Sequence, residues 1–543
     1  MKKMTALLLT VVLAAGLMAG CSTGANNSNG ETKGSQGQTS AGSEAATAQS
    51  PSGDNSGSDN VQSSEDTLTI ALALEPASLM PASSVSKEEL MVIDCMAETL
   101  FQWDPATGEI NPRLASYEWI DDTHFRVTLK EGIYFQNGEE LTTDDVLYTF
   151  QIKSAYSGGN YKAYNLEATK IEDKYHMVFE TNDVLVQAPE RFVQDEFAIL
   201  SKKTLEAMGG AENTDLKPTE GYGTGKYMFK EWVSGQYILL ERNDNYWNTE
   251  DMPYYKNLKF VFVNDAAARA MAVESGDADV GSDLPTSQGK IYEGNDKVAL
   301  HYLDTMMTGT LFMNCSRGPL QDARVREAIW NLVDVNALNQ LVGSGLGKTC
   351  ETTISPYSIV YDPVPEGTIR QVNVERAKEL LAEAGYPDGF TLEMTNMATQ
   401  QAQGEIIQEN LRQGGINVNI TINETPTHFS WLREGNYDLT ISNLSPMYYT
   451  ENLRLVDGRN STADVYGGAN YKDESFYPLL DKAYGAFDMD ERIAAYKDCQ
   501  DYMKENFIVV GTHTTVKLEL ARAGLSSPGL TAMGYADYTT VRP

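Results

Sequence analysis

The stretch Gly221–Trp247 constrains the fold of this chain more than any other part of the sequence. Two runs rich in aromatic and branched residues, Lys226–Trp232 and Gln236–Arg242, flank the short segment Val233–Gly235. Such runs around a glycine-containing turn predict a β-hairpin. Three glycines precede the hairpin and let the backbone turn tightly and approach a neighbouring segment closely; they are Gly221, Gly223 and Gly225.

The composition indicates a large globular protein that carries strong negative charge. A chain of 543 residues is long enough for about two or three domains, and 41% of its residues are hydrophobic. The formal net charge of −34 argues against sequence-neutral binding of nucleic acid, because such binding needs clustered Lys and Arg. The charge suits a soluble, mutually repelling protein outside the cell.

The N-terminus carries the signals of an exported lipoprotein. A charged start, Met1–Lys3, precedes the apolar run Thr5–Gly16, which is too short to span a bilayer comfortably. The small residues just before Cys21 resemble a bacterial lipobox, so we expect residues 1–20 to be a signal peptide and Cys21 to become lipidated. The alternatives are an ordinary signal peptide with an incidental cysteine and a transmembrane anchor.

The segment that follows, up to Asp66, contains almost no large apolar residue. Because such a composition cannot bury a core, we expect residues 21–66 to form a lipidated, disordered tether. A flexible coil of about 45 residues has a root-mean-square reach of roughly 35–40 Å. The tether would hold a globular body away from a membrane.

The body of the chain contains both predicted strands and predicted helices. The predicted strands are Thr67–Leu74, Phe125–Leu129, Lys259–Val263, Gly309–Asn314, Gly415–Ile420, Asn436–Ile441, Phe507–Val510 and Lys517–Leu520. The predicted helices are Glu89–Leu100, Leu141–Phe150, Asp265–Glu274, Arg324–Leu341, Ala377–Ala384, Gln403–Arg412 and Ile493–Glu505.

Several separate blocks of sequence resemble the family 5 extracellular solute-binding proteins, the peptide-binding receptors of ABC importers. The blocks are the hairpin Gly223–Trp247, the segment Pro319–Ile329, and the helix with its glycine stop, Ala377–Phe390. The resemblance runs from about Thr67 to about Val516. It implies a two-lobed α/β fold of the periplasmic-binding-protein-like type (type II, cluster C) with an extra subdomain.

The resemblance also implies domain boundaries. Lobe I would consist of residues 67–110, 222–308 and 512–543. Residues 111–221 would form the inserted subdomain, and residues 309–511 would form lobe II. The two lobes would close like a hinge over the bound solute.

The resemblance places the ligand site in the cleft between the lobes. The residues expected to contact the ligand are Glu75, Thr308, Gly309, Asn443, Met447, Tyr448 and Tyr449. Peptide-binding relatives carry Trp-x-x-Asp-Tyr in the last of these regions, and their Asp pairs with the α-amino group of the peptide. Leu444 stands here in place of the Trp, and Met447 in place of the Asp. Because a thioether is a weak acceptor, we expect that the α-amino group is not anchored at position 447.

The predicted function is an extracytoplasmic receptor that captures a peptide-like solute and delivers it to the permease subunits of an ABC importer. We expect a monomer with a lipid anchor in the membrane, without enzymatic activity, cofactor or nucleic-acid partner. One alternative is the same fold binding an oligosaccharide or a metal chelate. Another is an extracytoplasmic hydrolase, for which the sequence offers no His-Glu-x-x-His and no Gly-x-Ser-x-Gly.

Two residue types leave questions open. The histidines are mutually distant in sequence, and a single one of them can still bind a metal chelate; they are His124, His176, His301, His428 and His513. Besides Cys21, the cysteines show no Cys-x-x-Cys spacing, and the sequence does not choose between disulfides and free thiols; they are Cys95, Cys315, Cys350 and Cys499.

Overall fold

A computed structural model describes residues 66–80, 86–104, 107–157, 163–210, 222–363, 370–446, 449–460 and 468–543. The predicted signal peptide, lipidation site and tether lie outside these residues, except for Asp66 at the end of the tether. The described residues form the body of the protein.

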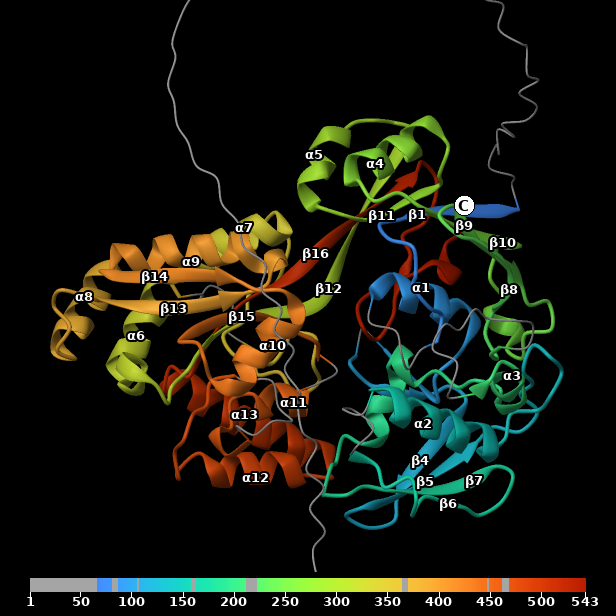
Figure 1. Ribbon diagram of the computed structural model, residues 1–543, viewed down its shortest axis with the longest axis horizontal. Helices are drawn as coiled ribbons and strands as arrows, with labels where there is room; N and C mark the ends of the chain where they lie inside the picture. Colours follow the sequence, from blue (N-terminus) through green and yellow to red (C-terminus); the bar gives the residue numbers. More distant parts are fainter. Residues whose placement is uncertain are drawn as a thin grey trace, which may run out of the picture. The chain divides into compact units, whose positions relative to one another are not determined.

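One mixed sheet runs through both halves of the body (Figure 1). Its strand order is β14-β13-β15-β12-β16-β11-β1-β10-β9-β8. The first half holds β1 (Thr67–Leu72), β8 (Tyr227–Val233), β9 (Tyr237–Arg242), β10 (Asn257–Phe262) and β11 (Val280–Leu284). The second half holds β13 (Phe390–Asn396), β14 (Ile416–Ile422) and β15 (Leu439–Leu444). Two long strands, β12 (Val298–Met313) and β16 (Val509–Arg522), pair with each other and join the halves.

Helices accompany each half of the sheet. The first half has α1 (Lys87–Met96), α4 (Ala266–Ser275) and α5 (Gly289–Tyr292). The second half has α6 (Ala323–Leu332), α7 (Val335–Gly343), α8 (Val374–Glu383), α9 (Gln401–Gln413), α10 (Thr425–Glu434), α11 (Tyr449–Arg454), α12 (Tyr477–Gly485) and α13 (Met489–Glu505). Each half buries its own apolar side chains, one cluster around Ile70 and Leu258 and the other around Leu311 and Ile407.

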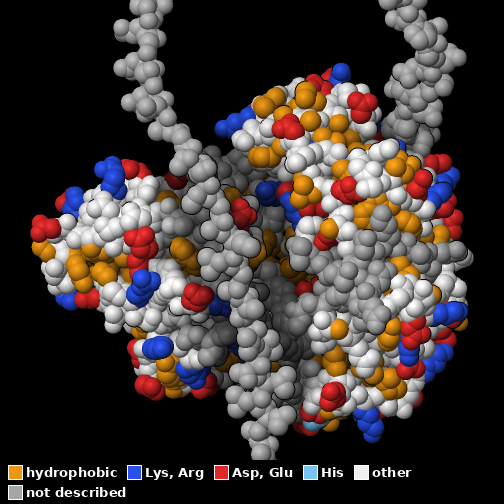
Figure 2. Space-filling view, viewed as in Figure 1, with side chains coloured by type: hydrophobic (Ala, Val, Ile, Leu, Met, Phe, Trp, Pro, Cys, Tyr) orange, Lys and Arg blue, Asp and Glu red, His pale blue; other side chains and the backbone are white. Residues whose placement is uncertain are grey.

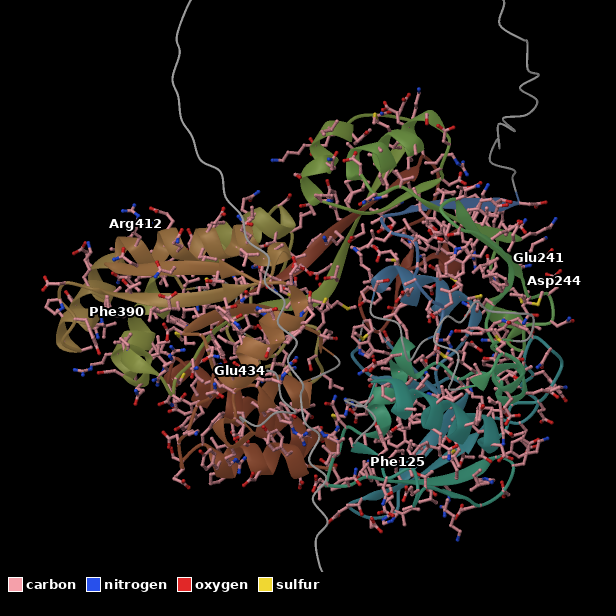
Figure 3. The ribbon with its side chains drawn as sticks, viewed as in Figure 1. Phe125, Glu241, Asp244, Phe390, Arg412 and Glu434 are labelled. Atoms are coloured by element: carbon pink, nitrogen blue, oxygen red, sulfur yellow. The ribbon has the colours of Figure 1, made fainter. Side chains whose placement is uncertain are left out.

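A third cluster of buried side chains belongs to the segment inserted between β1 and the hairpin. It is built on a separate sheet of order β4-β5-β7-β6, with β4 (Ala115–Trp119), β5 (His124–Leu129), β6 (Lys170–Ile171) and β7 (His176–Glu180). Phe125, labelled in Figure 3, lies on β5 in this cluster. The short pairs β2 (Phe101–Trp103) with β3 (Ile110–Pro112) and β17 (Gly529–Leu530) with β18 (Ala536–Asp537), and the helices α2 (Thr143–Ser157) and α3 (Lys202–Ala207), complete the described elements.

The predicted hairpin is confirmed as β8 and β9, which pair antiparallel around a turn at Gly235, where φ is 73°. The glycines before it serve the predicted close approach. The amide of Gly225 donates to the Met96 carbonyl at 2.9 Å, at the end of α1. A Cβ atom at Gly223 would lie 2.4 Å from the Met96 carbonyl oxygen, so only glycine fits there without a shift.

Two predicted elements differ in the structure. The single helix expected over Arg324–Leu341 is two helices, α6 and α7, because Asp334 accepts hydrogen bonds from the amides of Asn336 and Ala337 and starts a new helix. The two closing strands expected at Phe507–Val510 and Lys517–Leu520 are one continuous strand, β16. Its polar middle is held in the sheet by pairing with β12.

The four cysteines of the body, Cys95, Cys315, Cys350 and Cys499, are buried free thiols in the structure. Burial raises the pKa of the Cys315 thiol to about 11 and that of the Cys350 thiol to about 12. Such thiols stay protonated near neutral pH and behave as small apolar side chains. The open question of disulfides is therefore answered in favour of thiols.

The close packing of Gly225 on α1 predicts the effect of a single methyl group. In Gly225→Ala the new Cβ would lie 2.5 Å from the carbonyl carbon of Met96. Because the backbone must move to make room for the methyl group, we expect unfolding in urea to show that the free energy of unfolding falls by about 1–3 kcal/mol. Gly485→Ala is the control, because its Cβ would have nothing within 4 Å at the end of α12. Equal effects of the two substitutions would contradict the packing argument.

Candidate functional site

The structure brings three of the predicted ligand residues together on neighbouring strands. Gly309 of β12 lies directly opposite Asn443 of β15, and Thr308 lies opposite Leu444 of β15 and Thr514 of β16. The side chain of Asn443 is exposed, whereas Thr308 is buried. These residues lie where the two long strands cross from one half of the body to the other.

The pairing of β12 with β16 is irregular at this point. Between Thr308 and Thr310 on β12 the register shifts, so β16 passes from Thr514 to Gly511 over the same interval. An extra residue of this kind is a bulge, which re-aims the neighbouring side chains. A Cβ atom at Gly309 would lie 3.6 Å from Cε1 of His513, so the imidazole lies beside the glycine.

His513 is one of the histidines for which the sequence left metal-chelate binding open, and nothing in the sequence placed it beside Gly309. Its side chain is fully buried, and neither ring nitrogen has a hydrogen-bond partner among the described residues. Burial lowers the pKa of His513 to about 4, so the imidazole is neutral at physiological pH. The Oγ1 atom of Thr310 also lacks a partner within the described ranges. Buried polar groups without partners are rare in native proteins and often mark sites that bind water or a ligand.

The predicted contact at Glu75 is held by the hairpin. Its carboxylate accepts a hydrogen bond from Nε1 of Trp232 at 2.9 Å and one from the amide of Gly235 at 3.0 Å. The loop after β1 is thereby tied to β8 and β9. A carboxylate with two such donors is stabilised in its charged form and positioned by the hairpin.

The rest of the predicted site is described only in part. Met447 and Tyr448 lie outside the described residues, and Tyr449 is placed only as the first residue of α11. Leu444 is 7% exposed and packs in the core of the second half, so the position that carries Trp in peptide-binding relatives is a core position here.

The inserted segment contacts the second half directly, in addition to the two crossing strands. Nη1 of Arg492 lies 2.7 Å from Oε1 of Glu190, and both side chains are almost fully buried. The amide of Thr450 donates to Oε1 of Gln187 at 3.1 Å. The rings of Trp119 and Phe487 meet edge to face with their centroids 5.0 Å apart.

The described residues contain no group of three or more His, Cys, Asp or Glu side chains arranged to hold a metal ion. No helix among them is both long and apolar enough to cross a membrane. Acidic and basic side chains are mixed over the described part of the face in Figure 2.

Solved structures with the same fold cover 88% of this chain. HbpA2 from Haemophilus parasuis has a TM-score of 0.75 and 21% identity, with 99% of its chain covered. NikA from Brucella suis, in complex with Fe(III)-EDTA, has a TM-score of 0.73 and 20% identity, with 99% covered. A dipeptide-binding protein from Pseudoalteromonas in complex with Met-Leu has a TM-score of 0.70 and 21% identity, with 99% covered. These likenesses confirm the predicted two-lobed α/β fold.

Curated relatives also match long stretches of this chain, but they cover a smaller share of it than the solved structures do. The glutathione-binding protein GsiB of Pectobacterium atrosepticum is 27% identical over 364 residues, which is 65% of this chain and 68% of the relative. The dipeptide-binding protein of Escherichia coli is 26% identical over 462 residues, 77% of this chain and 83% of the relative. The family profile described as bacterial extracellular solute-binding proteins, family 5 Middle, matches residues 109–461. The chain therefore belongs to the family 5 bacterial extracellular solute-binding proteins.

Proposed function

We propose that this chain is the solute receptor of an ABC importer and that it captures a peptide-like solute between its two lobes. Relatives named for binding glutathione, oligopeptides and dipeptides support this class of solute. The solute contacts would include Thr308, Gly309 and Asn443, with Met447, Tyr448 and Tyr449 beside them. Glu75, which is held by the hairpin, would contact the solute from lobe I.

We place the lobe boundaries where the family resemblance implies them. Lobe I comprises residues 67–110, 222–308 and 512–543, with residues 111–221 as the inserted subdomain and residues 309–511 as lobe II. The cluster around Leu311 and Ile407 lies wholly within residues 309–511 and the cluster around Ile70 and Leu258 wholly outside them, which supports the boundary between lobe I and lobe II. Delivery to the permease then requires that the solute bind the closed arrangement better than the open one.

The observation that carries this proposal is the buried ion pair between Glu190 and Arg492. It joins the inserted segment to the second half at a point outside the two crossing strands. A charge pair withdrawn from water is tolerated only when both partners are present. The contact thus fixes one arrangement of the two halves, which is what a receptor that closes over its solute needs.

The remaining parts of the proposal concern the N-terminus and the absence of catalysis. We place the protein outside the cytoplasmic membrane as a monomer held by a lipid on Cys21, after removal of residues 1–20. Relatives described as periplasmic support the extracytoplasmic location. Membership of a family of solute-binding receptors supports a protein without enzymatic activity or cofactor.

Solute binding should stabilise and compact the protein. A panel of dipeptides, tripeptides and glutathione identifies a binder by calorimetry. At a hundredfold excess of that binder over its Kd we expect the free energy of unfolding to rise by about 2.7 kcal/mol. Small-angle scattering should show a smaller radius of gyration in the complex. An unchanged profile with a saturating binder would contradict closure.

The buried ion pair gives a sharper version of this test. Arg492→Gln leaves the Glu190 carboxylate buried without its cation in the closed arrangement, so we expect the affinity for the same peptide to fall about tenfold or more. Arg412→Gln removes the same charge from the outer side of α9, where the side chain is 63% exposed (Figure 3), and should leave the affinity unchanged. Equal affinities of the two variants would contradict a role of the pair in closure.

The anchor is tested in cells. Cys21→Ala should move the protein from the membrane fraction to the medium or periplasm and abolish labelling by a fatty acid, because a lipid supplies the membrane affinity. The matched control is Cys95→Ala, a buried thiol of α1. Retention of Cys21→Ala in the membrane fraction would refute lipidation at this residue.

A metal chelate is the second candidate solute, and His513 is the observation that favours it. The neutral, unpartnered imidazole beside Gly309 has the chemistry of a metal ligand. We expect Fe(III)-EDTA, if bound, to bind equally at pH 8 and pH 5, because the pKa of His513 lies at about 4. His513→Gln should then abolish binding, whereas His176→Gln, at the start of β7 where the side chain is 42% exposed, should not. Binding of Fe(III)-EDTA that survives in His513→Gln would rule out His513 as the residue that holds the metal.

A further inference from the structure

A pocket of about 240 Å³ lies where the inserted segment meets the second half. Trp103 of β2 lines one side together with Tyr117 and Glu190 of the inserted segment, and the second half contributes Ser358, Pro446 and Met489. A single water molecule needs about 10–15 Å³ of such space, so the pocket holds a much larger group. Pro446 lies two residues after the end of β15, the strand that carries the predicted contact Asn443, so one short segment links the predicted solute site to the pocket.

The walls combine aromatic rings with carboxylates. Trp103 is 9% exposed, and Tyr117 lies on β4 next to it in the lining. The carboxylates that line the pocket are those of Glu190, which is buried, and Glu109, which is exposed. Burial and the nearby charge of Glu190 both raise the pKa of the Tyr117 phenol. Aromatic rings beside carboxylates are the surroundings that stabilise an ammonium or guanidinium group.

The charges around the pocket sum to a negative site. Glu190 is compensated by Arg492, whose guanidinium also donates to the carbonyls of Ala486 and Phe487. The carboxylate of Glu109 adds a second negative charge to the lining. Met489 lies in the first turn of α13, whose amides favour anions, but that end is capped by Asp488 and carries Asp490 and Glu491. Carboxylates therefore outnumber cationic groups around the pocket, and the net charge there is negative.

The pocket also holds an unused hydrogen-bonding group. The hydroxyl oxygen of Ser358 is buried and has no partner among the described residues. A hydroxyl can accept a hydrogen bond from an ammonium group. An occupant with an N–H donor would satisfy a polar atom that is otherwise left without a partner at a cost.

We propose that this pocket is a second contact site for the solute and takes a basic side chain of a bound peptide, such as that of lysine. This inference rests on the proposed peptide receptor function and adds the chemistry of one subsite to it. Because the pocket has walls from both the inserted segment and the second half, its occupant touches both. Filling it favours the arrangement in which the two parts meet.

The test uses three pairs of tripeptides. Each pair has alanine at two positions and carries lysine or norleucine at the third, so its members share a straight aliphatic arm and differ in the ammonium group. Calorimetry with the full body of the protein should show that at least one lysine peptide binds about fivefold tighter than its norleucine partner. The variable residue stands at the first, second or third position of the tripeptide, so the three pairs cover every position from which its side chain can reach the pocket.

Two variants assign the preference to the pocket. Glu109→Gln removes an exposed carboxylate of the lining, and Ser358→Ala removes the unpartnered hydroxyl; each should reduce the lysine preference by at least half. Glu375→Gln is the control with the same loss of charge, because that side chain on α8 is 86% exposed and does not line the pocket. It should keep the preference of the unmodified protein.

The outcomes separate this inference from the proposed function. Equal binding of both members in all three pairs would overturn the basic subsite and leave a peptide receptor. A lysine preference that persists in both Glu109→Gln and Ser358→Ala would also overturn it, since the ammonium would then be recognised elsewhere. Failure of all six peptides to bind, where other peptides bind, would likewise contradict the subsite. Failure of every peptide would contradict the proposed peptide receptor itself.

Discussion

The pairing of β12 with β16 is the interaction on which the rest of the structure depends. Among the described strands, the two halves of the large sheet meet only through this pair, and its register is interrupted between Asp304 and Thr310. Met306, within this interval, has a φ of 62°, and its carbonyl accepts from the Ser355 hydroxyl. Each half keeps its own core, and a connection of two strands with irregular pairing suits the hinge that we propose between them. The predicted solute residues Thr308 and Gly309 lie at this same connection.

A hinge of this kind needs something that defines its closed position. The pair of Glu190 and Arg492 supplies a contact outside the crossing strands, and its geometry is restrictive because Arg492 also donates to two backbone carbonyls. Removing two charges from water nearly cancels their attraction, so the pair adds little net stability. The ion pair instead selects one arrangement of the inserted segment and the second half, because any arrangement that buries one partner without the other is strongly disfavoured. Small differences in solute contact can then decide which arrangement is populated.

The sequence predicts the local elements well and the long-range neighbours poorly, for physical reasons. The hairpin and the helices α4, α9 and α13 follow from glycine stops, capping residues and apolar periodicity, all of which are local. The polar stretch at the centre of β16 has no such pattern, and it is a strand because β12 and the segment at Thr349 hold its backbone. The proximity of His513 to Gly309 depends on a bulge, which no spacing in the sequence records. The family resemblance, by contrast, pointed to Thr308, Gly309 and Asn443, which do lie on adjacent strands.

This chain has no aspartate at the position expected just after β15, so it must recognise a charged group of the solute with other residues. Leu444 packs in the core and Met447 carries no charge, so neither side chain can supply the charged anchor that the resemblance leads one to expect there. Glu75 is already held by two donors of the hairpin, which lowers its capacity to bind a further cation. The carboxylates that line the pocket beside Pro446 are the alternative. Moving the charged contact from the strand end to the inserted segment couples recognition to the approach of the two halves, since the pocket is complete only where they meet. A solute without a positive charge could still bind at β12 and β15, but it would gain less from closure.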